Sequence, residues 1–177
     1  MRLDTAQANY SYGKLQRVLE KSVTCVWSSG WTSILVLGLG GGSIIHSLRK
    51  NFNYKGLIDA VEIDSVCLDL AINYFQIKKL PGSINFIRED AAEFLKKTTG
   101  SWDLIIIDLF IDNKIPENII CEEFVQQTYF KLKSNGHIIF NVILKNDIQS
   151  LRTILKNLEL KWTEKKILGN FVLFLPK

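Results

Sequence analysis

The amino-acid sequence predicts an α/β domain built on a doubly wound, mostly parallel sheet with a C-terminal antiparallel hairpin. Strand and helix patterns alternate along the chain, and the runs "LIIID" and "HIIFNVI" show no polar alternation. Continuous apolar runs of this kind are typical of strands that helices cover on both faces. Strand–helix alternation favours parallel strands joined by helical crossovers. These two observations predict the fold class.

Hydrophobic periodicity and turn residues place the individual elements. The expected parallel strands are TSILVLGLG (32–40), GLIDAVEID (56–64), INFIRED (84–90), WDLIIIDLF (102–110) and HIIFNVI (137–143). The expected helices cover about 11–22, 43–51, 65–75, 91–98, 121–132 and 147–158. Ser65 and Asp147 are predicted N-caps, and Asn135-Gly136 is a predicted turn. Gly169-Asn170 is the predicted two-residue loop of the terminal hairpin.

Length and composition describe one domain of ordinary globular character. The 177 residues are expected to form a single unit, in which residues 1–30 make an N-terminal helical segment that covers the core. The net charge is +4 and no Lys/Arg run exceeds two residues, so nucleic-acid binding is not indicated. No apolar run approaches the ~18–20 residues that span a bilayer. Three scattered cysteines and two histidines predict a reduced, cytoplasmic protein without a metal site.

Glycines and acids follow successive predicted strands. The glycines at the end of the first strand are Gly38, Gly40, Gly41 and Gly42. Glu62 ends the second strand 24 positions after Gly38, near the ~20-residue spacing at which an acid binds ribose hydroxyls. Asp90 and Asp108 end the third and fourth strands, while Asp64 is expected to cap the next helix. Because parallel strands end at one edge of a sheet, this pattern predicts a nucleoside-binding site there.

The segments VLGLGGGS, VEID, IREDAAEFL, WDLIIIDLF and IPENIICEEFVQQTYFKLKSNGHIIFN carry a family resemblance. They resemble the spermidine-synthase-like branch of the class I S-adenosylmethionine-dependent methyltransferase superfamily, over residues 33–143. The resemblance implies the Rossmann-like class I methyltransferase fold and S-adenosylmethionine as cofactor. It also implies that the glycine loop lies against the methionine part, that Glu62 binds the ribose and that Asp90 contacts the adenine amine. Ala91 and Asp108 complete the expected cofactor-binding set, and Asp108, which faces the reacting end, is also the expected catalytic residue.

Two positions depart from the polyamine synthases of this branch. Those enzymes resemble this chain but carry acids where this sequence has Ser43 and Ile111. A cationic aminopropyl group and a cationic amine acceptor call for carboxylates that offset their desolvation. The missing acids favour ordinary S-adenosylmethionine over its decarboxylated form. The sequence is therefore interpreted as an S-adenosylmethionine-dependent methyltransferase, in which Asp108 orients the acceptor or accepts its proton.

Two alternatives stay open at this point. One is an aminopropyltransferase, a polyamine synthase that uses decarboxylated S-adenosylmethionine. The other is a catalytically inactive protein that binds a nucleoside or a partner. A nicotinamide dehydrogenase is disfavoured because it gives less reason for Asp90 and Asp108. The expected methyl acceptor is a small molecule or a protein, without a membrane or nucleic-acid partner, and formation of a homodimer is left open.

Aromatic side chains and histidines have weaker functional interpretations. Tyr10, Trp27 and Trp31 are candidates for the wall of a substrate pocket, although aromatic residues at the end of a domain more often cover the core. His46 falls within the first crossover helix and His137 at the start of the fifth strand. We expect both histidines to be structural.

Overall fold

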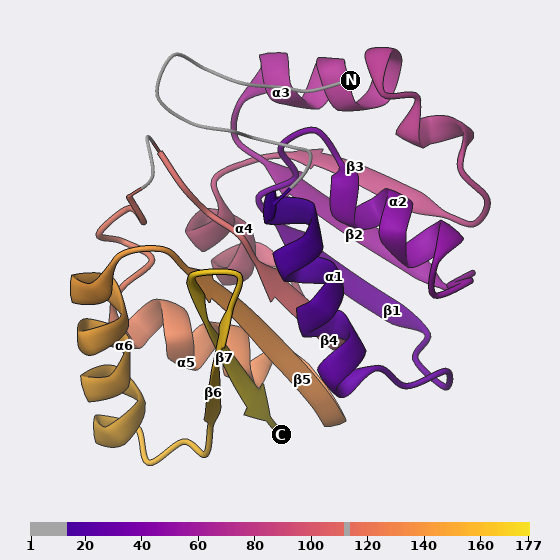
Figure 1. Cartoon of the computed structure of the whole chain (residues 1–177). Helices are drawn as coiled ribbons and strands as arrows, with labels where there is room; N and C mark the ends of the chain where they lie inside the picture. Colours follow the sequence, from indigo (N-terminus) through magenta and orange to yellow (C-terminus); the bar gives the residue numbers. More distant parts are fainter. Residues whose placement is uncertain (1–13, 112–113) are drawn as a thin grey trace.

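The structure, a computed structural model, describes residues 14–111 and 114–177 (Figure 1). Its centre is one sheet with the strand order β3-β2-β1-β4-β5-β7-β6. The strands are β1 Ser33–Leu37, β2 Leu57–Glu62, β3 Ile84–Arg88, β4 Trp102–Ile107, β5 Leu132–Val142, β6 Thr163–Ile167 and β7 Asn170–Pro176. Neighbours from β3 to β5 pair in parallel, and β7 runs antiparallel to both β5 and β6. The predicted doubly wound sheet and its terminal hairpin are confirmed.

Helices cover both faces of this sheet (Figure 1). They are α1 Lys14–Val26, α2 Ser43–Lys50, α3 Ser65–Asp69, α4 Ala91–Lys97, α5 Glu122–Phe130 and α6 Lys145–Asn157. A wider π-type turn, Leu70–Tyr74, extends α3, and a 3₁₀ turn follows at Ile77–Lys79. Apolar residues of α1 and α2 pack with one face of the sheet, and those of α4, α5 and α6 pack with the other.

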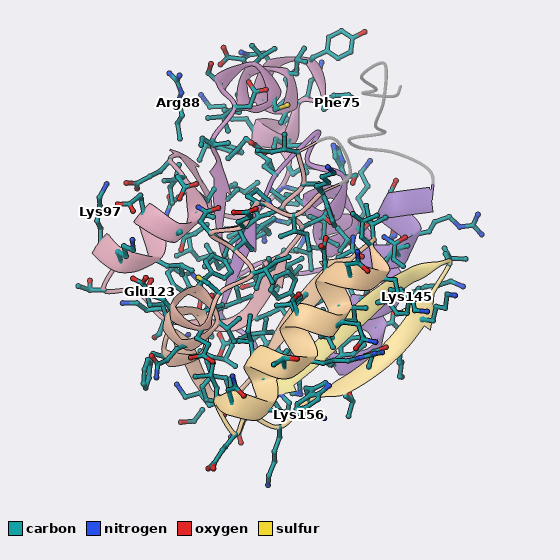
Figure 2. All side chains as sticks on the ribbon, turned by 90° about the vertical axis from the view of Figure 1, so that its left-hand side faces the viewer. Phe75, Arg88, Lys97, Glu123, Lys145 and Lys156 are labelled. Carbon is teal, nitrogen blue, oxygen red and sulfur yellow. The ribbon has the colours of Figure 1, made fainter. Side chains whose placement is uncertain are left out.

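The central strand shows why the apolar runs lack alternation. Ile34 and Val36 of β1 belong to the core on the α1–α2 side, whereas Leu35 and Leu37 belong to the core on the α4–α6 side. Every residue of β1 is buried, because successive side chains point to opposite faces and both faces are covered. Among the described residues, Arg49 and Asp59 are buried charged residues, and the other charged side chains are partly or fully exposed. Figure 2 shows Arg88, Lys97, Glu123, Lys145 and Lys156 on the periphery, and all five are exposed.

Two predicted helix caps are wrong. Asp64, not Ser65, caps α3, and its Oδ1 accepts the backbone N–H of Val66 over 2.8 Å. The expectation that Asp64 caps a helix is thereby confirmed. Leu144, not Asp147, is the N-cap of α6. Asp147 lies inside the first turn, where a carboxylate still interacts favourably with the helix dipole.

Two predicted turns differ in detail from the structure. β5 begins at Leu132 and runs through Asn135, whose φ is +62°, so the expected turn is an irregularity inside the strand. The pairing of β5 with β4 shifts its register at this place. In the terminal hairpin Ile167 pairs with Asn170, which makes Leu168-Gly169 the two-residue loop. Both loop residues have positive φ, as the favoured hairpin turns require.

The described N-terminal part of the chain begins with α1. The predicted helix at 11–22 appears as α1, while residues 1–13, and Tyr10 with them, lie outside the described residues. Trp27 and Trp31 stand before β1, with ring centroids 5.4 Å apart. They lie at the amino end of that strand, opposite the glycine loop, so they cover the core and do not wall a site at the glycine loop. No helix in the described ranges is long and apolar enough to cross a membrane.

Candidate functional site

The loops after β1 and β4 meet at the centre of the sheet edge. The strand order runs outward from β1 in one direction and from β4 in the other (Figure 1). Doubly wound sheets bind their ligands at this switch point. Gly38 follows β1 with a φ of +87°, and a Cβ added to it would lie 2.3 Å from the backbone oxygen of Asp108. Only glycine allows this close approach between the two loops.

The glycine loop forms a compact turn into α2. Gly42 donates its N–H to the carbonyl of Leu39 over 2.9 Å, and Gly42 itself is the left-handed N-cap of α2. Gly40 also has a positive φ, of +49°, and Gly41 is buried. A Cβ on Gly42 would lie 2.9 Å from Cγ2 of Ile77. The turn therefore needs glycine for its backbone shape, whatever ligand it contacts.

Glu62, at the end of β2, holds this loop in place. Its Oε2 accepts the backbone N–H groups of Leu39 and Gly40, each over 3.0 Å. Its Oε1 accepts the N–H of Asp64 over 3.1 Å. The sequence analysis gave Glu62 a ribose-binding role only and missed this contact with the loop. Since a carboxylate oxygen can accept two hydrogen bonds, Oε1 keeps capacity for one further donor.

Asp90 caps α4 with one of its oxygens. Oδ1 accepts the N–H groups of Ala92 and Glu93, over 2.9 and 3.1 Å. Oδ2 has no hydrogen-bonding partner among residues 14–111 and 114–177. Ala91, the first residue of α4, is buried. Capping thus uses half of the Asp90 carboxylate, and the other oxygen is available to a ligand.

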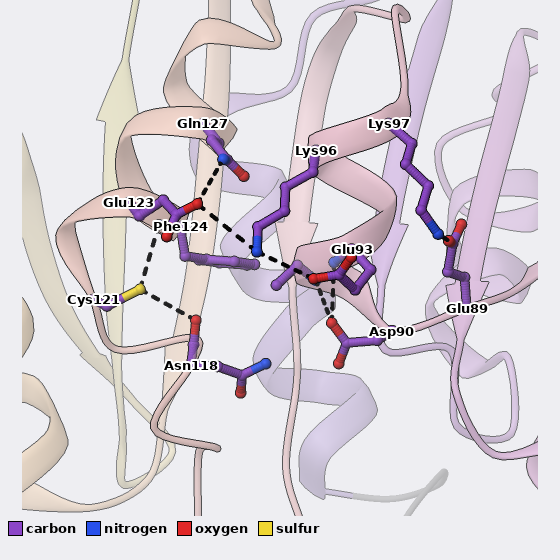
Figure 3. A network of polar contacts seen from close by, with 11 residues as sticks. Glu89, Asp90, Glu93, Lys96, Lys97, Asn118, Cys121, Glu123, Phe124 and Gln127 are labelled. Carbon is purple, nitrogen blue, oxygen red and sulfur yellow. Dashed lines mark hydrogen bonds and ion pairs between the residues drawn. The ribbon is translucent and has the colours of Figure 1, made fainter.

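A polar network lies next to Asp90 and connects α4 with α5 (Figure 3). Nζ of Lys96 lies 3.1 Å from Oε1 of Glu93 and 3.8 Å from Oε1 of Glu123. Gln127 donates to the same Glu123 oxygen over 3.2 Å. These side chains are largely exposed, and exposed ion pairs contribute little to stability. The network joins two helices beside the candidate site and is not part of it.

Asp108 is held by two buried amides that the sequence analysis missed. Nδ2 of Asn141, on β5, donates to Oδ1 of Asp108 over 2.8 Å. Nδ2 of Asn170, on β7, donates to Oδ1 of Asn141 over 3.0 Å. Asn141 interrupts the apolar run of β5, and a buried amide needs partners, which was the available signal. The partner on β7 became visible only with the sheet register.

The surroundings of Asp108 change its acidity. Burial disfavours the charged form and raises the pKa of this carboxyl, the hydrogen bond from Asn141 lowers it, and the negative charge of Glu62 raises it again. The net result is a pKa of about 6, above the ordinary value of 3.8. Asp108 therefore changes its charge within reach of neutral pH, as proton acceptors in enzymes commonly do.

The structure brings the predicted residues to one edge and leaves the histidines apart from it. Asp108 donates its N–H to the Leu37 carbonyl over 2.9 Å, and Gly38 donates to Val61 over 3.0 Å. His46 contacts the Phe75 carbonyl over 3.2 Å, and His137 packs against an aromatic ring, so both are structural. Within the described ranges, no group of three His, Cys, Asp or Glu side chains could hold a metal ion.

Ser43 and Ile111 stand at the two positions where the resemblance led us to expect acids. Ser43 is buried in the first turn of α2. Ile111 is 62% exposed and forms a bridge with Lys114, to which it is linked by two backbone hydrogen bonds of 2.8 and 3.0 Å. Neither side chain provides a charge, whereas Glu62, Asp90 and Asp108 each bring a carboxylate to this edge.

Comparison with known proteins identifies the relatives of this chain. The spermine/spermidine synthase domain matches residues 16–163. The polyamine aminopropyltransferase of Vibrio vulnificus is 32% identical over 112 residues, which cover 61% of this chain and 36% of that protein. The probable polyamine aminopropyl transferase of Bifidobacterium longum is 31% identical over 117 residues, 66% of this chain and 25% of that protein. The chain thus spans about a third or less of the length of these two relatives.

Solved structures show the same fold. A probable spermidine synthase from Corynebacterium glutamicum superposes with a TM-score of 0.74 at 19% identity, covering 96% of this chain and 65% of that one. Human methyltransferase-like protein 13, in complex with SAH, gives a TM-score of 0.69 at 22% identity, covering 92% of this chain and 78% of that one. The predicted class I methyltransferase fold is confirmed.

These findings correct the functional interpretation of the sequence. The prediction of a methyltransferase that uses S-adenosylmethionine is wrong, because the matching domain and the curated relatives are those of polyamine aminopropyltransferases. That prediction gave decisive weight to the acids missing at Ser43 and Ile111. It gave too little to Asp108, which keeps a carboxylate at the end of β4. The predicted resemblance is confirmed: the chain belongs to the spermine/spermidine synthase domain family.

Proposed function

We propose that this chain is the nucleoside-binding part of an aminopropyltransferase, which moves the aminopropyl group of decarboxylated S-adenosylmethionine to an amine. The observation that carries the proposal is the Asp108 carboxylate, half-buried at the switch point of a chain of this family. The chain spans 36% of the Vibrio vulnificus relative, so the activity of the whole protein is part of the proposal.

The acidic edge suits a cationic substrate. Decarboxylated S-adenosylmethionine carries a sulfonium and an ammonium group, and it lacks the carboxylate of its parent. The charge of Glu62 disfavours ionisation of Asp108 in the free protein. A bound cation reverses that penalty, because an opposite charge favours the ionised carboxylate. An edge with Glu62, Asp90 and Asp108 therefore favours the decarboxylated nucleoside over the parent with its additional negative charge.

In this proposal each site residue has a defined contact. The loop of Gly38, Gly40, Gly41 and Gly42 lies against the sulfonium end of the nucleoside. Oε1 of Glu62, which can accept one hydrogen bond beyond that from Asp64, accepts one from a ribose hydroxyl. Oδ2 of Asp90, with the backbone of Ala91, meets the adenine. Asp108 holds the ammonium group of the substrate or accepts the proton of the attacking amine.

The reaction requires positioning and a proton acceptor. The nitrogen of the acceptor amine attacks the aminopropyl carbon that is bonded to sulfur. A C–N bond forms, and the C–S bond breaks with its electron pair going to sulfur, which yields methylthioadenosine. The nitrogen loses one proton, which an ionised Asp108 can accept. A carboxyl with a pKa of about 6 is ionised at neutral pH and is a better base than an ordinary aspartate.

Product analysis tests the proposal. The chain is incubated with decarboxylated S-adenosylmethionine and putrescine, and methylthioadenosine and spermidine are measured by mass spectrometry. We expect both products in equal amounts, and a loss of at least a hundredfold in rate with Asp108→Asn, since a positioned proton acceptor contributes about 10²–10⁴-fold. Methyl transfer from S-adenosylmethionine to an amine, without aminopropyl transfer, would refute it.

A further inference from the structure

A chain of three side chains runs through the buried part of the sheet to the candidate site. Asn170 is the first residue of β7, Asn141 lies near the end of β5, and Asp108 follows β4. The two links are 3.0 Å, from Asn170 to Asn141, and 2.8 Å, from Asn141 to Asp108. Asn141 is completely buried and Asn170 is 9% exposed. Two hydrogen bonds thus connect β7 and β5 to the residue that follows β4; the one between the asparagines is buried and the one to Asp108 is partly buried.

The direction of this chain is determined by its chemistry. An amide has donors at its nitrogen and acceptors at its oxygen, whereas an ionised carboxylate only accepts. Because Asn170 donates to the oxygen of Asn141, the nitrogen of Asn141 faces Asp108. The reverse orientation would place the Asn141 oxygen against Asp108, which is tolerable only when that carboxyl carries a proton. The observed order therefore matches an ionised Asp108.

The two oxygens of Asp108 are consequently not equivalent. Oδ1 is occupied by Asn141. Oδ2 has no hydrogen-bonding partner in the described part of the chain. The titratable group there whose charge acts on Asp108 is Glu62, from β2, while β5 contributes the neutral Asn141. Oδ2 is the oxygen that remains for a cation.

We propose that Asn170 is a positioning residue that acts through Asn141, keeping Oδ1 of Asp108 as an acceptor and reserving Oδ2 for the cationic amine of the substrate. The part that concerns the substrate rests on the proposed function, whereas the part that concerns the carboxylate does not. The C-terminal hairpin thereby gains a role in the site, because it brings Asn170 beside β5.

The substitution Asn170→Asp keeps the size of the side chain, removes the donor and adds a charge, and Asn170→Ala, which removes the donor without adding a charge, separates the two effects. The Asn141 amide then donates to the new carboxylate and turns its oxygen toward Asp108. The pKa of Asp108 should rise by about one pH unit or more, since a hydrogen bond to a charged group contributes roughly 1.5–3 kcal/mol. The readout is the carbon-13 NMR titration of the Asp108 carboxyl in the free protein.

Two further variants separate positioning from folding. Asn170→Ser replaces the amide donor with a hydroxyl donor. In this variant the pKa of the Asp108 carboxyl should stay within a few tenths of a pH unit of its value in the unmodified protein. Leu173→Ala removes apolar volume from a buried β7 residue that pairs with Phe140 on the opposite face of the sheet, so it should lower stability and leave the Asp108 titration unchanged. If Asn170→Asp does not fold, the other two Asn170 variants decide. A higher Asp108 pKa in Asn170→Ala, together with an unchanged Asp108 pKa in Asn170→Ser, supports the same conclusion.

Binding measurements then connect the three hydrogen-bonded side chains, Asn170, Asn141 and Asp108, to the substrate. The pH at which decarboxylated S-adenosylmethionine reaches half of its maximal affinity should move upward in Asn170→Asp together with the NMR titration. An unchanged Asp108 titration in folded Asn170→Asp and Asn170→Ala would overturn the inference. A shifted titration in a protein that does not bind the nucleoside would leave the hydrogen-bond chain intact and refute the proposed function instead.

Discussion

Nδ2 of Asn141 lies 2.8 Å from Oδ1 of Asp108, and this contact joins β5 to the residue that follows β4. It stabilises the ionised carboxylate against the opposing effects of burial and of the Glu62 charge. The contact gives Asp108 a fixed orientation at the point where the strand order reverses. Its consequences for stability, for pH dependence and for ligand binding can be measured separately.

Asp108→Asn should stabilise the protein at neutral pH. The pKa of this acid is raised from 3.8 to about 6 in the folded state, so ionisation favours the unfolded chain. This loss of folding free energy caused by ionisation of Asp108 is absent below about pH 3.8, grows between pH 3.8 and 6, and is fully present above pH 6. Urea unfolding of both proteins at pH 4 and pH 8 checks this. A variant that is less stable than the unmodified protein at pH 8 would contradict it.

Binding of the cationic nucleoside should strengthen as the pH rises through about 6. An ionised Asp108 attracts the ammonium group, whereas the protonated form, which predominates below its pKa of about 6, does not. Isothermal titration of decarboxylated S-adenosylmethionine between pH 5 and 8 measures the effect. Asp108→Asn is the control and should show a much flatter dependence. Equal pH dependence in both proteins would assign the titration to another group.

Gly38→Ala should lower the free energy of unfolding by about 1–3 kcal/mol, because Gly38 has a φ of +87° and the new Cβ would meet the Asp108 backbone oxygen at 2.3 Å. Gly30→Ala is the matched control, since its Cβ would have Ser28 Oγ as nearest atom at 3.9 Å. Chemical denaturation of the two variants compares them. The close approach of the loops is disproved if both glycines tolerate alanine equally.

Glu62→Gln should weaken nucleoside binding at least tenfold and loosen the glycine loop. The carboxylate accepts N–H groups of Leu39, Gly40 and Asp64, and a glutamine offers one acceptor oxygen in its place. Hydrogen exchange of the Leu39 and Gly40 amides reports on the loop, and calorimetry with methylthioadenosine reports on binding. Unchanged exchange of these amides would show that Glu62 does not hold the loop.

The sequence predicted the parallel sheet well because its evidence is local. The apolar runs of β1 and β4 have no polar alternation, and that pattern directly reflects burial on both faces. Gly38, Glu62, Asp90 and Asp108 were predicted as site residues for the same reason, since each lies at or shortly after the end of a strand. The predicted N-caps of α3 and α6 were wrong by one and three residues. For α3, Asp64 and Ser65 are both good N-cap residues, and the choice between them depends on backbone angles.

The contacts that organise the site could not be predicted from one sequence. Asn141 and Asn170 meet only because β7 pairs with β5 in one register, in which Asn141 faces Val172. The hairpin loop lies one residue before its predicted place, which shifts the partner of every β6 residue on β7 by two residues. The functional error had another origin, because the identities of Ser43 and Ile111 are visible in the sequence and the buried surroundings of Asp108 are not.

The most direct measurement is a calorimetric comparison of decarboxylated S-adenosylmethionine with S-adenosylmethionine, for the unmodified protein and for Asp108→Asn at pH 7.5. At that pH Asp108 is ionised, since its pKa is about 6. We predict that the unmodified protein binds the decarboxylated nucleoside at least tenfold more tightly, as expected for one charged hydrogen bond of roughly 1.5–3 kcal/mol, and that Asp108→Asn loses this preference. Equal or tighter binding of S-adenosylmethionine by the unmodified protein would contradict the account.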